Sequence, residues 1–374
     1  MYCAGRMTRD YISVRNGIAG MTEGMPSIRA SVVVINHNYG EFLATAIDSA
    51  LAQDHADVEV VVVDDGSTDH SAAIIAGYGD RIRAVMKAQG GHVEAVNAGY
   101  AASSGEVVLF LDADDLIHPD CLRRALAMLQ PGDSKVQFRL ATLDRTGADQ
   151  NMPFPHFPPN FSADDVLRGA ARSGWYPWTV STGNVFVRGF LDRVMPIDAK
   201  TVYRSPDGYL SKLAPLYGPV RSLREVLGGY RVHGQNAWAS SQKTWSADTA
   251  LRWLAFDRVL ERAFVSAAQT QGVVVRQPLL RSFQALEYRM QALRFADPDK
   301  RPPDSRQTVM TDAVHWLVEL HPFGWPGSVA RFGWLAFLGY APRRLVERQV
   351  RKARTQTNRS LFWRSMLSLT RKFE

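Results

Sequence analysis

The stretch Gly105-Glu-Val-Val-Leu-Phe-Leu-Asp-Ala-Asp-Asp115 places an apolar run directly before three carboxylates. Near-continuous hydrophobicity over residues 106–111 is typical of a strand that is covered on both faces, as in a parallel sheet. In open parallel sheets, ligands bind beyond the carboxyl ends of the strands. The stretch therefore predicts a central strand and the edge of the sheet at which a ligand would bind.

Before this stretch, short β-branched runs alternate with helical patterns, which is the rhythm of βαβ units in an α/β fold. The predicted strands are Ser31–Ile35, Val58–Val63, Ile82–Met86 and Glu106–Leu111, and the predicted helices are Glu41–Gln53, Asp69–Ala76 and His92–Ala102.

After Pro119 the order of elements becomes mixed. We expect a helix to Gln130, strands at Val136–Leu143 and Asn184–Arg188, helices at Ala163–Ala171 and Asp207–Leu216, and a strand pair around Val220–Val232. Beyond about Ser240 the pattern is mainly helical. The chain is thus predicted to hold a flexible tail over residues 1–27, an α/β domain over 28–240 and a helical C-terminal region over 241–374.

The composition indicates a globular protein, because 46% of the 374 residues are apolar. Cys3 and Cys121 are too few and too separated for a disulfide framework or a zinc site, which favours a reducing compartment and a cytoplasmic location. Residues 1–27 contain no apolar core of the length found in secretion signals. No segment offers about 20 uninterrupted apolar residues, so a membrane-spanning helix is not expected.

Polar residues follow three of the predicted strands. Such a crowd of carboxylates repels itself unless a cation compensates, and carboxylate oxygens suit Mg²⁺ or Mn²⁺ better than zinc. Asp112 and Asp114 would project to the same side of a chain that is still extended, with Asp115 turned away. The alternative is that the acidic residues only cap helices and turns. The three strand ends are Asn36-His-Asn-Tyr-Gly40, Asp64-Asp-Gly-Ser-Thr-Asp69 and Asp112-Ala-Asp-Asp115.

With those residues in place, the stretch from Ser31 to about Asn236 resembles the family 2 glycosyltransferases, which have the A-type nucleotide-sugar-binding fold, a Rossmann-like mixed sheet flanked by helices. Four blocks match in order: Ser31-Val-Val-Val-Ile-Asn-His-Asn-Tyr-Gly-Glu-Phe-Leu43, Val60-Val-Val-Val-Asp-Asp-Gly-Ser-Thr-Asp69, Gly90-Gly-His-Val-Glu-Ala-Val-Asn-Ala-Gly99 and Gly105–Asp115.

The resemblance implies an inverting transfer of a sugar from a nucleotide diphosphate-sugar, in which Asp112 and Asp114 hold the metal and the diphosphate. It implies that Asp207, at the start of a helix, is the general base, although Pro206 stands where the family more often has a second acid. His233 either approaches the metal or is a loop histidine that bonds the backbone. The residues that inherit nucleotide-sugar binding by position are Asn36, Asn38, Tyr39, Glu41, Asp64, Asp65, Asp112, Ala113 and Asp114.

Two features point to the acceptor. The aromatic residues Trp175, Tyr176 and Trp178 either stack on an acceptor sugar or lipid-linked glycan or pack in the core. The Pro-rich loop Pro153–Pro159 lies in the region where acceptor specificity is expected. The resemblance favours UDP-sugars as donors and bacterial cell-surface polysaccharide or glycolipid assembly as the role.

The C-terminal end is strongly basic. Residues 331–374 carry eleven Arg or Lys against two Glu, a net +9, within a chain of net +7. Apolar Phe362, Met366, Leu369 and Phe373 share one helical face, which predicts a basic amphipathic helix on an anionic membrane at the cytoplasmic surface. Packing on the catalytic domain or a solvated end are the alternatives. No nucleic-acid-binding module is recognisable, so a nucleic-acid partner is not expected.

Three other functions compete with sugar transfer. A nucleotidyltransferase would have a Gly-rich, Lys-containing entry loop, which the sequence lacks. A processive polysaccharide synthase would have several membrane spans and a Gln-x-x-Arg-Trp motif, whereas Thr249 stands at the Gln position before Arg252-Trp253. A catalytically silent nucleotide- or glycan-binding scaffold protein would be expected to lose the acidic pair, and Asp112 and Asp114 are both present.

Overall fold

The structure is a computed structural model that describes residues 28–234, 236, 246–276, 279, 282–319 and 324–355. The predicted N-terminal tail and the predicted amphipathic helix around residues 362–373 lie outside the described residues.

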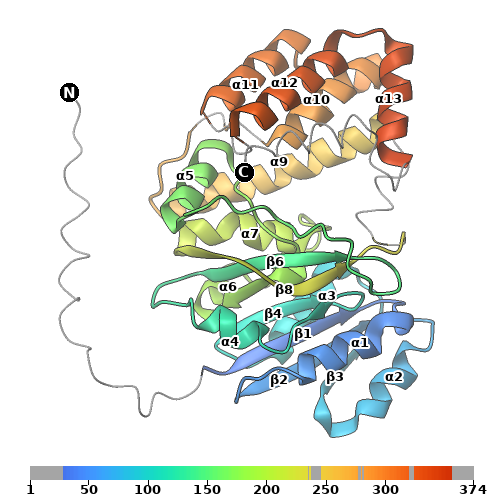
Figure 1. The fold of residues 1–374 in the computed structure, drawn as a ribbon, viewed down its shortest axis with the longest axis vertical. Helices are drawn as coiled ribbons and strands as arrows, with labels where there is room; N and C mark the ends of the chain where they lie inside the picture. Colours follow the sequence, from blue (N-terminus) through green and yellow to red (C-terminus); the bar gives the residue numbers. More distant parts are fainter. Residues whose placement is uncertain are drawn as a thin grey trace, which may run out of the picture.

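An eight-stranded mixed sheet forms the lower half of the molecule (Figure 1). β1 lies between β2 and β4, and β3 lies beyond β2, with all three pairs parallel. β7 then runs antiparallel to both β4 and β6, and β8 pairs with β6 in parallel. The strand order is β3-β2-β1-β4-β7-β6-β8-β5, with β1 Ala30–Asn36, β2 Val58–Asp65, β3 Arg83–Lys87, β4 Val107–Asp112, β5 Leu116–Ile117, β6 Lys135–Leu143, β7 Asn184–Val187 and β8 Val220–Arg231.

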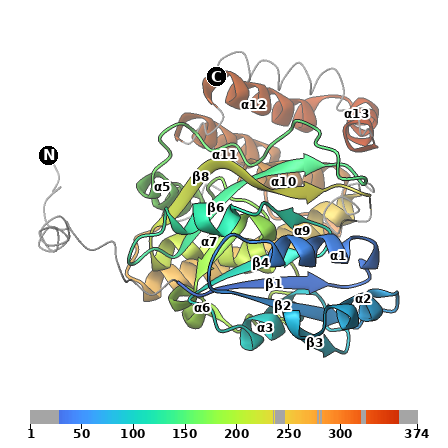
Figure 2. The same cartoon turned by 60° about the horizontal axis from the view of Figure 1, so that its bottom comes forward.

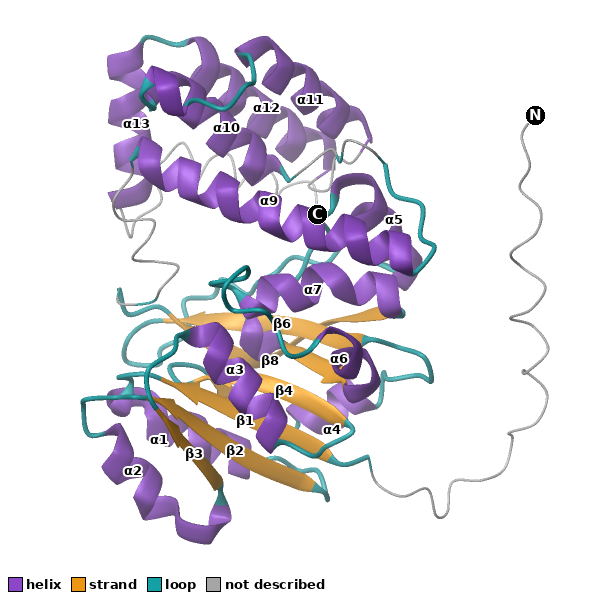
Figure 3. Cartoon of the chain, turned by 180° about the vertical axis from the view of Figure 1, so that it is seen from behind, coloured by secondary structure: helices purple, strands orange, loops and turns teal. Residues whose placement is uncertain are grey.

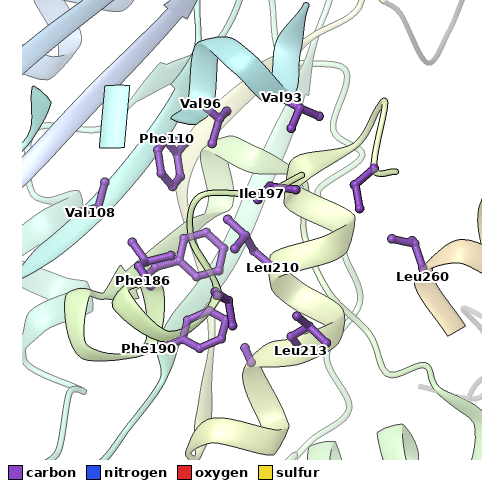
Figure 4. Packing of buried hydrophobic residues seen from close by; sticks show 14 of the residues in the cluster. Val93, Val96, Val108, Phe110, Phe186, Phe190, Ile197, Leu210, Leu213 and Leu260 are labelled. Carbon is purple, nitrogen blue, oxygen red and sulfur yellow. The ribbon is translucent and has the colours of Figure 1, made fainter. Parts of the chain in front are cut away.

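Helices cover both faces of the sheet, because alternate residues of its buried strands point to opposite sides. On one face, Val32 and Val34 pack with α1 (Gly40–Leu51), α2 (Ser71–Tyr78) and α4 (Cys121–Leu126). On the other face, Val33 and Ile35 pack with α3, α6 and α7, which span His92–Ala102, Arg188–Val194 and Pro206–Tyr217. Figure 2 shows the sheet between α1 and α3, and Figure 4 shows the second core, where Phe110 and Phe186 face Leu210 of α7.

The C-terminal region is helical in its described residues. α9 (Ala247–Thr270) runs between α7 and the remaining helices (Figure 3). Its residues Phe256, Leu260 and Phe264 join the core between the sheet and α7, and Leu254 packs on Tyr288 of α10. The other helices, α10 Phe283–Phe295, α11 Arg306–Glu319, α12 Gly324–Tyr340 and α13 Arg343–Thr355, share a separate core. None of the described helices is long and apolar enough to cross a membrane.

Some predicted elements differ from the structure. The predicted strand pair around Val220–Val232 is one long strand, β8, because Gly228 and Gly229 lie inside it where β5 and Leu143 approach closely rather than at a turn. The helix predicted to reach Gln130 ends at Leu126. The sequence did not predict α6 or the two-residue β5, which is too short to show a period.

Gly99 of α3 gives a direct test of the helix-to-sheet contact, because a Cβ there would overlap the side chain of Val33 in β1. We expect Gly99→Ala to lower the free energy of unfolding by about 1–3 kcal/mol through overpacking. Adding Val33→Ala makes room for the new methyl group, so the double variant loses less stability than the sum of the single changes. Urea unfolding measures all three.

Gly77→Ala in the exposed part of α2 is the matched control, because nothing lies within 4 Å of the added Cβ. It is expected to be neutral or slightly stabilising, as alanine favours helix. If Gly99→Ala is equally harmless, α3 does not need its close approach to the sheet.

Candidate active site

The register of the sheet brings the polar strand ends together. Asn36 at the end of β1 pairs with Asp64 of β2, and Ile35 pairs with Asp112 at the end of β4. Asp65 of β2 pairs with Lys87, the last residue of β3. The carboxyl ends of the four parallel strands therefore meet at one edge of the sheet.

A cavity of about 1880 Å³ opens at this edge and extends to residues of α7, α9, α10 and α12. Asn38, Glu41, Asp64 and His233, all predicted site residues, do not line it. The predicted residues that do line it are Asn36, Tyr39, Asp65, Asp112, Ala113, Asp114 and Asp207.

Asp64 and Asn38 hold two loops together. The Asp64 carboxylate is 2% exposed and accepts hydrogen bonds from Asn36 Nδ2 at 2.7 Å, from Ser67 Oγ at 2.6 Å and from Ser67 N at 3.0 Å. Asn38, with a φ of 59°, donates its backbone N–H to Ser67 Oγ at 2.8 Å and accepts from Thr68 N at 2.7 Å. The structure shows these two residues shaping the loops, and their direct contact with a nucleotide stays a prediction.

The surroundings of Tyr39 and Glu41 differ. Tyr39 directly precedes α1, and Glu41 lies in its first turn. The Tyr39 ring lies on the cavity wall, where burial and then the charges of Asp114 and Asp112 raise the pKa of its hydroxyl. Glu41 is exposed and pairs with Arg145 at 2.5 Å. Tyr39 is therefore neutral in the site, and Glu41 lies outside the cavity.

Asp65 fastens the glycine turn before α3. Its carboxylate is 3% exposed and accepts from Lys87 Nζ at 2.6 Å, Gly90 N at 2.9 Å and Gly91 N at 2.7 Å. Burial alone would raise the pKa of Asp65, but the hydrogen bonds from Lys87 and the two glycines lower it below its usual value. Asp65 is therefore an ionised carboxylate that orders this part of the cavity wall.

The acidic residues after β4 lie in a turn, so the prediction of a still-extended chain is wrong. The backbone N–H of Asp115 donates to the carbonyl of Asp112 at 3.0 Å. Asp115 is 1% exposed, and its carboxylate accepts from Thr182 Oγ1 at 2.6 Å and from the backbone N–H of Arg231 at 2.9 Å. It thus points away from the cavity, and Asp112 and Asp114 remain on the cavity wall.

The predicted set of metal ligands Asp112, Asp114 and His233 is not assembled as a group. In the described ranges, no three His, Cys, Asp or Glu side chains are placed to hold a metal ion. His233 Nε2 lies 2.9 Å from Asp114 Oδ2, which also accepts from Asn236 Nδ2 at 3.0 Å. The His233 side chain is 0% exposed, so it supports Asp114 from behind instead of facing the cavity.

The sequence did not point to His92, which stands at the first position of α3. Its Nε2 lies 3.5 Å from Asp112 Oδ1, and its side chain is 38% exposed on the cavity wall. Burial would lower the pKa of His92, but the hydrogen bond and charge of Asp112, followed by the charges of Asp207 and Asp114, raise it. The one sequence signal for this contact was the place of His92 in the third matching block, directly after Gly90 and Gly91.

Asp207 stands in the first turn of α7, where Pro206 fits the first helical position because it needs no N–H partner. Its Oδ1 accepts from Ser205 Oγ at 2.8 Å, and its carboxylate lies on the cavity wall. Lys135, fully buried in β6, holds the helix by donating to Ser211 Oγ at 2.9 Å. Burial lowers the pKa of Lys135, and the charge of Asp207 partly opposes that shift.

The aromatic residues considered for the acceptor divide into two roles. Trp175 and Trp178 line the cavity, whereas Tyr176 is 1% exposed and donates its hydroxyl to the Ser211 carbonyl at 2.6 Å. Core packing is therefore the role of Tyr176. The Pro-rich loop also contributes to the wall, through Pro153, Phe154, His156, Pro158 and Pro159.

Comparison with known proteins agrees with this fold. Residues 31–169 match the family model described as glycosyl transferase family 2. A protein of Nostoc sp. called an uncharacterized glycosyltransferase is 36% identical over 231 residues, which cover 60% of this chain and 70% of that protein. The chain belongs to glycosyl transferase family 2, it is a glycosyltransferase, and the predicted A-type fold is confirmed.

Other relatives match a smaller part. The succinoglycan biosynthesis protein ExoO of Rhizobium meliloti is 39% identical over 120 residues, 31% of this chain and 34% of that protein. Among solved structures, S. aureus TarS in complex with UDP has a TM-score of 0.49 and 16% identity, covering 88% of this chain and 90% of that one. Mannosyltransferase PcManGT from Pyrobaculum calidifontis, in complex with GDP-Man and Mn²⁺, has a TM-score of 0.49 and 17% identity, covering 88% and 86%. UDP, GDP-Man and Mn²⁺ are ligands of those two proteins.

Asp65 makes a pH-dependent contribution to stability. Its folded-state pKa lies below the ordinary value of 3.8, so the contribution is present above that value and is lost as the pH falls through the folded-state pKa. We expect Asp65→Asn to lower the free energy of unfolding by about 1–3 kcal/mol at neutral pH, with the difference shrinking below pH 3.8.

Urea unfolding between pH 7 and pH 3 measures this difference, and Asp80→Asn, at an exposed position, is the control. A loss of stability that is the same at every pH would show that the charge of Asp65 is not the cause.

Proposed function

We propose that this glycosyltransferase moves a sugar from a nucleotide diphosphate-sugar to an acceptor hydroxyl, with inversion at the anomeric carbon and with Mg²⁺ or Mn²⁺. The observation that carries the proposal is that Asp112, Asp114 and Asp207 line one cavity at the carboxyl edge of a parallel sheet. Residues 28–240 would form the catalytic domain, and residues 241–374 the helical region that completes the cavity.

The donor set is suited to a hard cation. Asp112, Asp114, Asp115 and Asp207 act on one another through their charges, and burial, followed by the charges of Asp114 and Asp207, raises the pKa of Asp112 despite its contact with His92. Magnesium sites commonly use one or two carboxylates together with phosphate oxygens of the substrate, which fits a wall that offers Asp112 and Asp114. A bound cation would offset the charge that develops on the departing diphosphate.

Asp207 is the proposed general base. As the acceptor oxygen bonds to the anomeric carbon, its proton passes to the Asp207 carboxylate, and the bond from the anomeric carbon to the diphosphate breaks with its electron pair on the diphosphate. The hydrogen bond from Ser205 and the attachment of α7 to Lys135 keep this carboxylate in one position. Attack from the face opposite the diphosphate gives inversion.

The proposed donor nucleotide and biological role follow from the resemblance. UDP-sugars and the assembly of cell-surface polysaccharide or glycolipid are proposed from the resemblance, and the succinoglycan biosynthesis protein ExoO, of which the chain spans about a third, is consistent with a polysaccharide role. A cytoplasmic location, with attachment to the inner face of the cell membrane through residues 362–373, is proposed from the sequence alone.

Nucleotide binding should depend on the metal through Asp112. We expect UDP, rather than GDP or dTDP, to bind in the presence of Mn²⁺, and Asp112→Asn to weaken that binding at least about tenfold, or about 1.4 kcal/mol. In the described residues, His92 is the one ion-pair or hydrogen-bond partner of the Asp112 side chain, so the fold should survive this change. Calorimetry with and without Mn²⁺ measures the effect.

Asp164→Asn, an exposed change in α5 (Ala163–Ser173), is the control for nucleotide binding. UDP binding that needs neither the metal nor Asp112 would contradict the metal site, and preference for another nucleotide would correct the donor.

Loss of the base should affect transfer and not donor binding. We expect Asp207→Asn to slow transfer from the UDP-sugar by about 10²- to 10⁴-fold while the Kd for UDP stays unchanged. Initial rates with a panel of saccharide acceptors, and calorimetry with UDP, measure the two effects. A fully active Asp207→Asn enzyme would remove Asp207 from the mechanism, and retention of the anomeric configuration in the product would rule out the single displacement.

A further inference from the structure

The cavity extends beyond the sheet edge to residues of α9 and α10. Arg204, Trp253 and Phe256 line it there, together with Tyr288 of α10. These residues lie outside residues 31–169, which match the family model. This part of the wall therefore lies beyond the residues that match the family model.

Arg204 is a half-buried cation held by aromatic rings. Its guanidinium carbon lies 4.7 Å from the ring centre of Tyr203, 5.2 Å from that of Trp253 and 5.9 Å from that of Phe256. Within the described ranges, the guanidinium has no hydrogen-bond or ion-pair partner. Contacts of this kind use the faces of the guanidinium and fix its direction, and they leave its N–H groups available for an oxyanion.

Two of the three aromatic rings around Arg204 are packed against other residues, whereas Tyr203 is 47% exposed. Phe256 is 2% exposed, and Trp253 lies parallel to Tyr288, with ring centres 6.3 Å apart and an interplanar angle of 5°. Because α9 also packs in the core that it shares with α7, these rings are connected to the helix that carries Asp207. A cation that is already oriented loses less conformational entropy when it binds a ligand.

The other charged side chains near the helical region already have interactions of their own. Arg139, Lys212, Arg331, Asp257 and Glu261 also line the cavity, and each of them interacts with another residue. Asp112, Asp114 and Asp207 line the same cavity. Arg204 and these carboxylates would therefore attract different groups of one substrate.

Arg204 is also tied to the proposed base. Only Ser205 and Pro206 separate it from Asp207, and Ser205 has a φ of 49° and donates its hydroxyl to Asp207 at 2.8 Å. Arg204, Ser205 and Asp207 all line the same cavity, so one acceptor could contact both Arg204 and Asp207. Trp178 lines the same cavity and offers an apolar face for the sugar ring.

We propose that Arg204, oriented by Trp253 and Phe256, binds an oxyanion of the acceptor, a carboxylate or a phosphate carried by the acceptor sugar, and so selects anionic acceptor glycans. This inference rests on the proposed function, because it assigns the acceptor of the same reaction.

The first experiment measures acceptor binding by the wild-type protein with UDP and Mn²⁺ present. The probes are a disaccharide ending in glucuronic acid, its carboxyl-reduced neutral form and the 6-phosphate of that form. We expect at least one anionic probe to bind about 10- to 100-fold more tightly than the neutral one, the effect expected for a charge-assisted pair. Preference for the uronate identifies a carboxylate, and preference for the 6-phosphate identifies a phosphate. Binding that is no tighter for either anionic probe overturns the proposal.

The second experiment compares variants. Arg204→Gln is expected to abolish the preference for the anionic probe, and Arg204→Lys to retain part of it, because lysine keeps the charge and loses the planar pair of donors. Arg252→Gln, an exposed arginine of α9 that does not line the cavity, is the matched control and should change nothing. A preference that persists in Arg204→Gln overturns the assignment.

Calorimetry with UDP separates the two levels of inference. If the wild type binds UDP with Mn²⁺ and shows no anionic preference, only the Arg204 subsite is wrong. If the wild type binds neither UDP, GDP nor dTDP, the proposed function itself fails. UDP affinity that is unchanged in Arg204→Gln shows that the variant is folded and that its effect lies at the acceptor.

Discussion

The hydrogen bonds of the Asp115 carboxylate are the constraint on which the rest of the site depends. This buried group accepts from Thr182, two residues before β7, and from the backbone of Arg231 at the end of β8. It therefore connects the turn after β4 to two segments that lie far from it in the chain. An ionised carboxylate without these donors would be costly to bury, and burial together with Asp114 and Asp112 already raises its pKa. The hydrogen bonds from Thr182 and Arg231 therefore stabilise the turn after β4.

Because the Asp115 side chain is held away from the cavity, the side-chain directions of its neighbours are also constrained. Arg231 also donates from Nε to the Asp114 carbonyl at 3.0 Å, and His233 and Asn236 hold one oxygen of the Asp114 carboxylate. The end of β8 thus supports the acidic turn through several contacts. On the other side of β1, Asp65 performs a related task by holding the glycine turn before α3, which brings His92 beside Asp112. Buried polar residues, some of which do not line the cavity, determine how the residues on its wall are oriented.

The helix α9 connects the two halves of the molecule. It contributes Phe256 and Leu260 to the core under the sheet and Leu254 to the contact with α10, so the same element that stabilises the interface also lines the cavity. The site is therefore built from the sheet edge, from α7 and from the helical region together. In this arrangement Asp112 and Asp114 can serve the donor and Arg204 the acceptor. Asp207 lines the same cavity.

The sequence by itself determined the α/β class, the parallel strands and the edge at which Asn36, Asp65 and Asp112 gather, because period, β-branched runs and the shared edge of parallel strands follow local rules. It also predicted α3 with its observed bounds, His92–Ala102. Only the tertiary structure decided the turn of the backbone after β4 and the partners of Asp115, the support of Asp114 by His233, the contact of His92 with Asp112 and the far wall around Arg204. The physical reason is that their partners are remote: Thr182 is 67 residues from Asp115, and Arg231 is 116 residues from it, and no local pattern records which distant donor a buried carboxylate will meet.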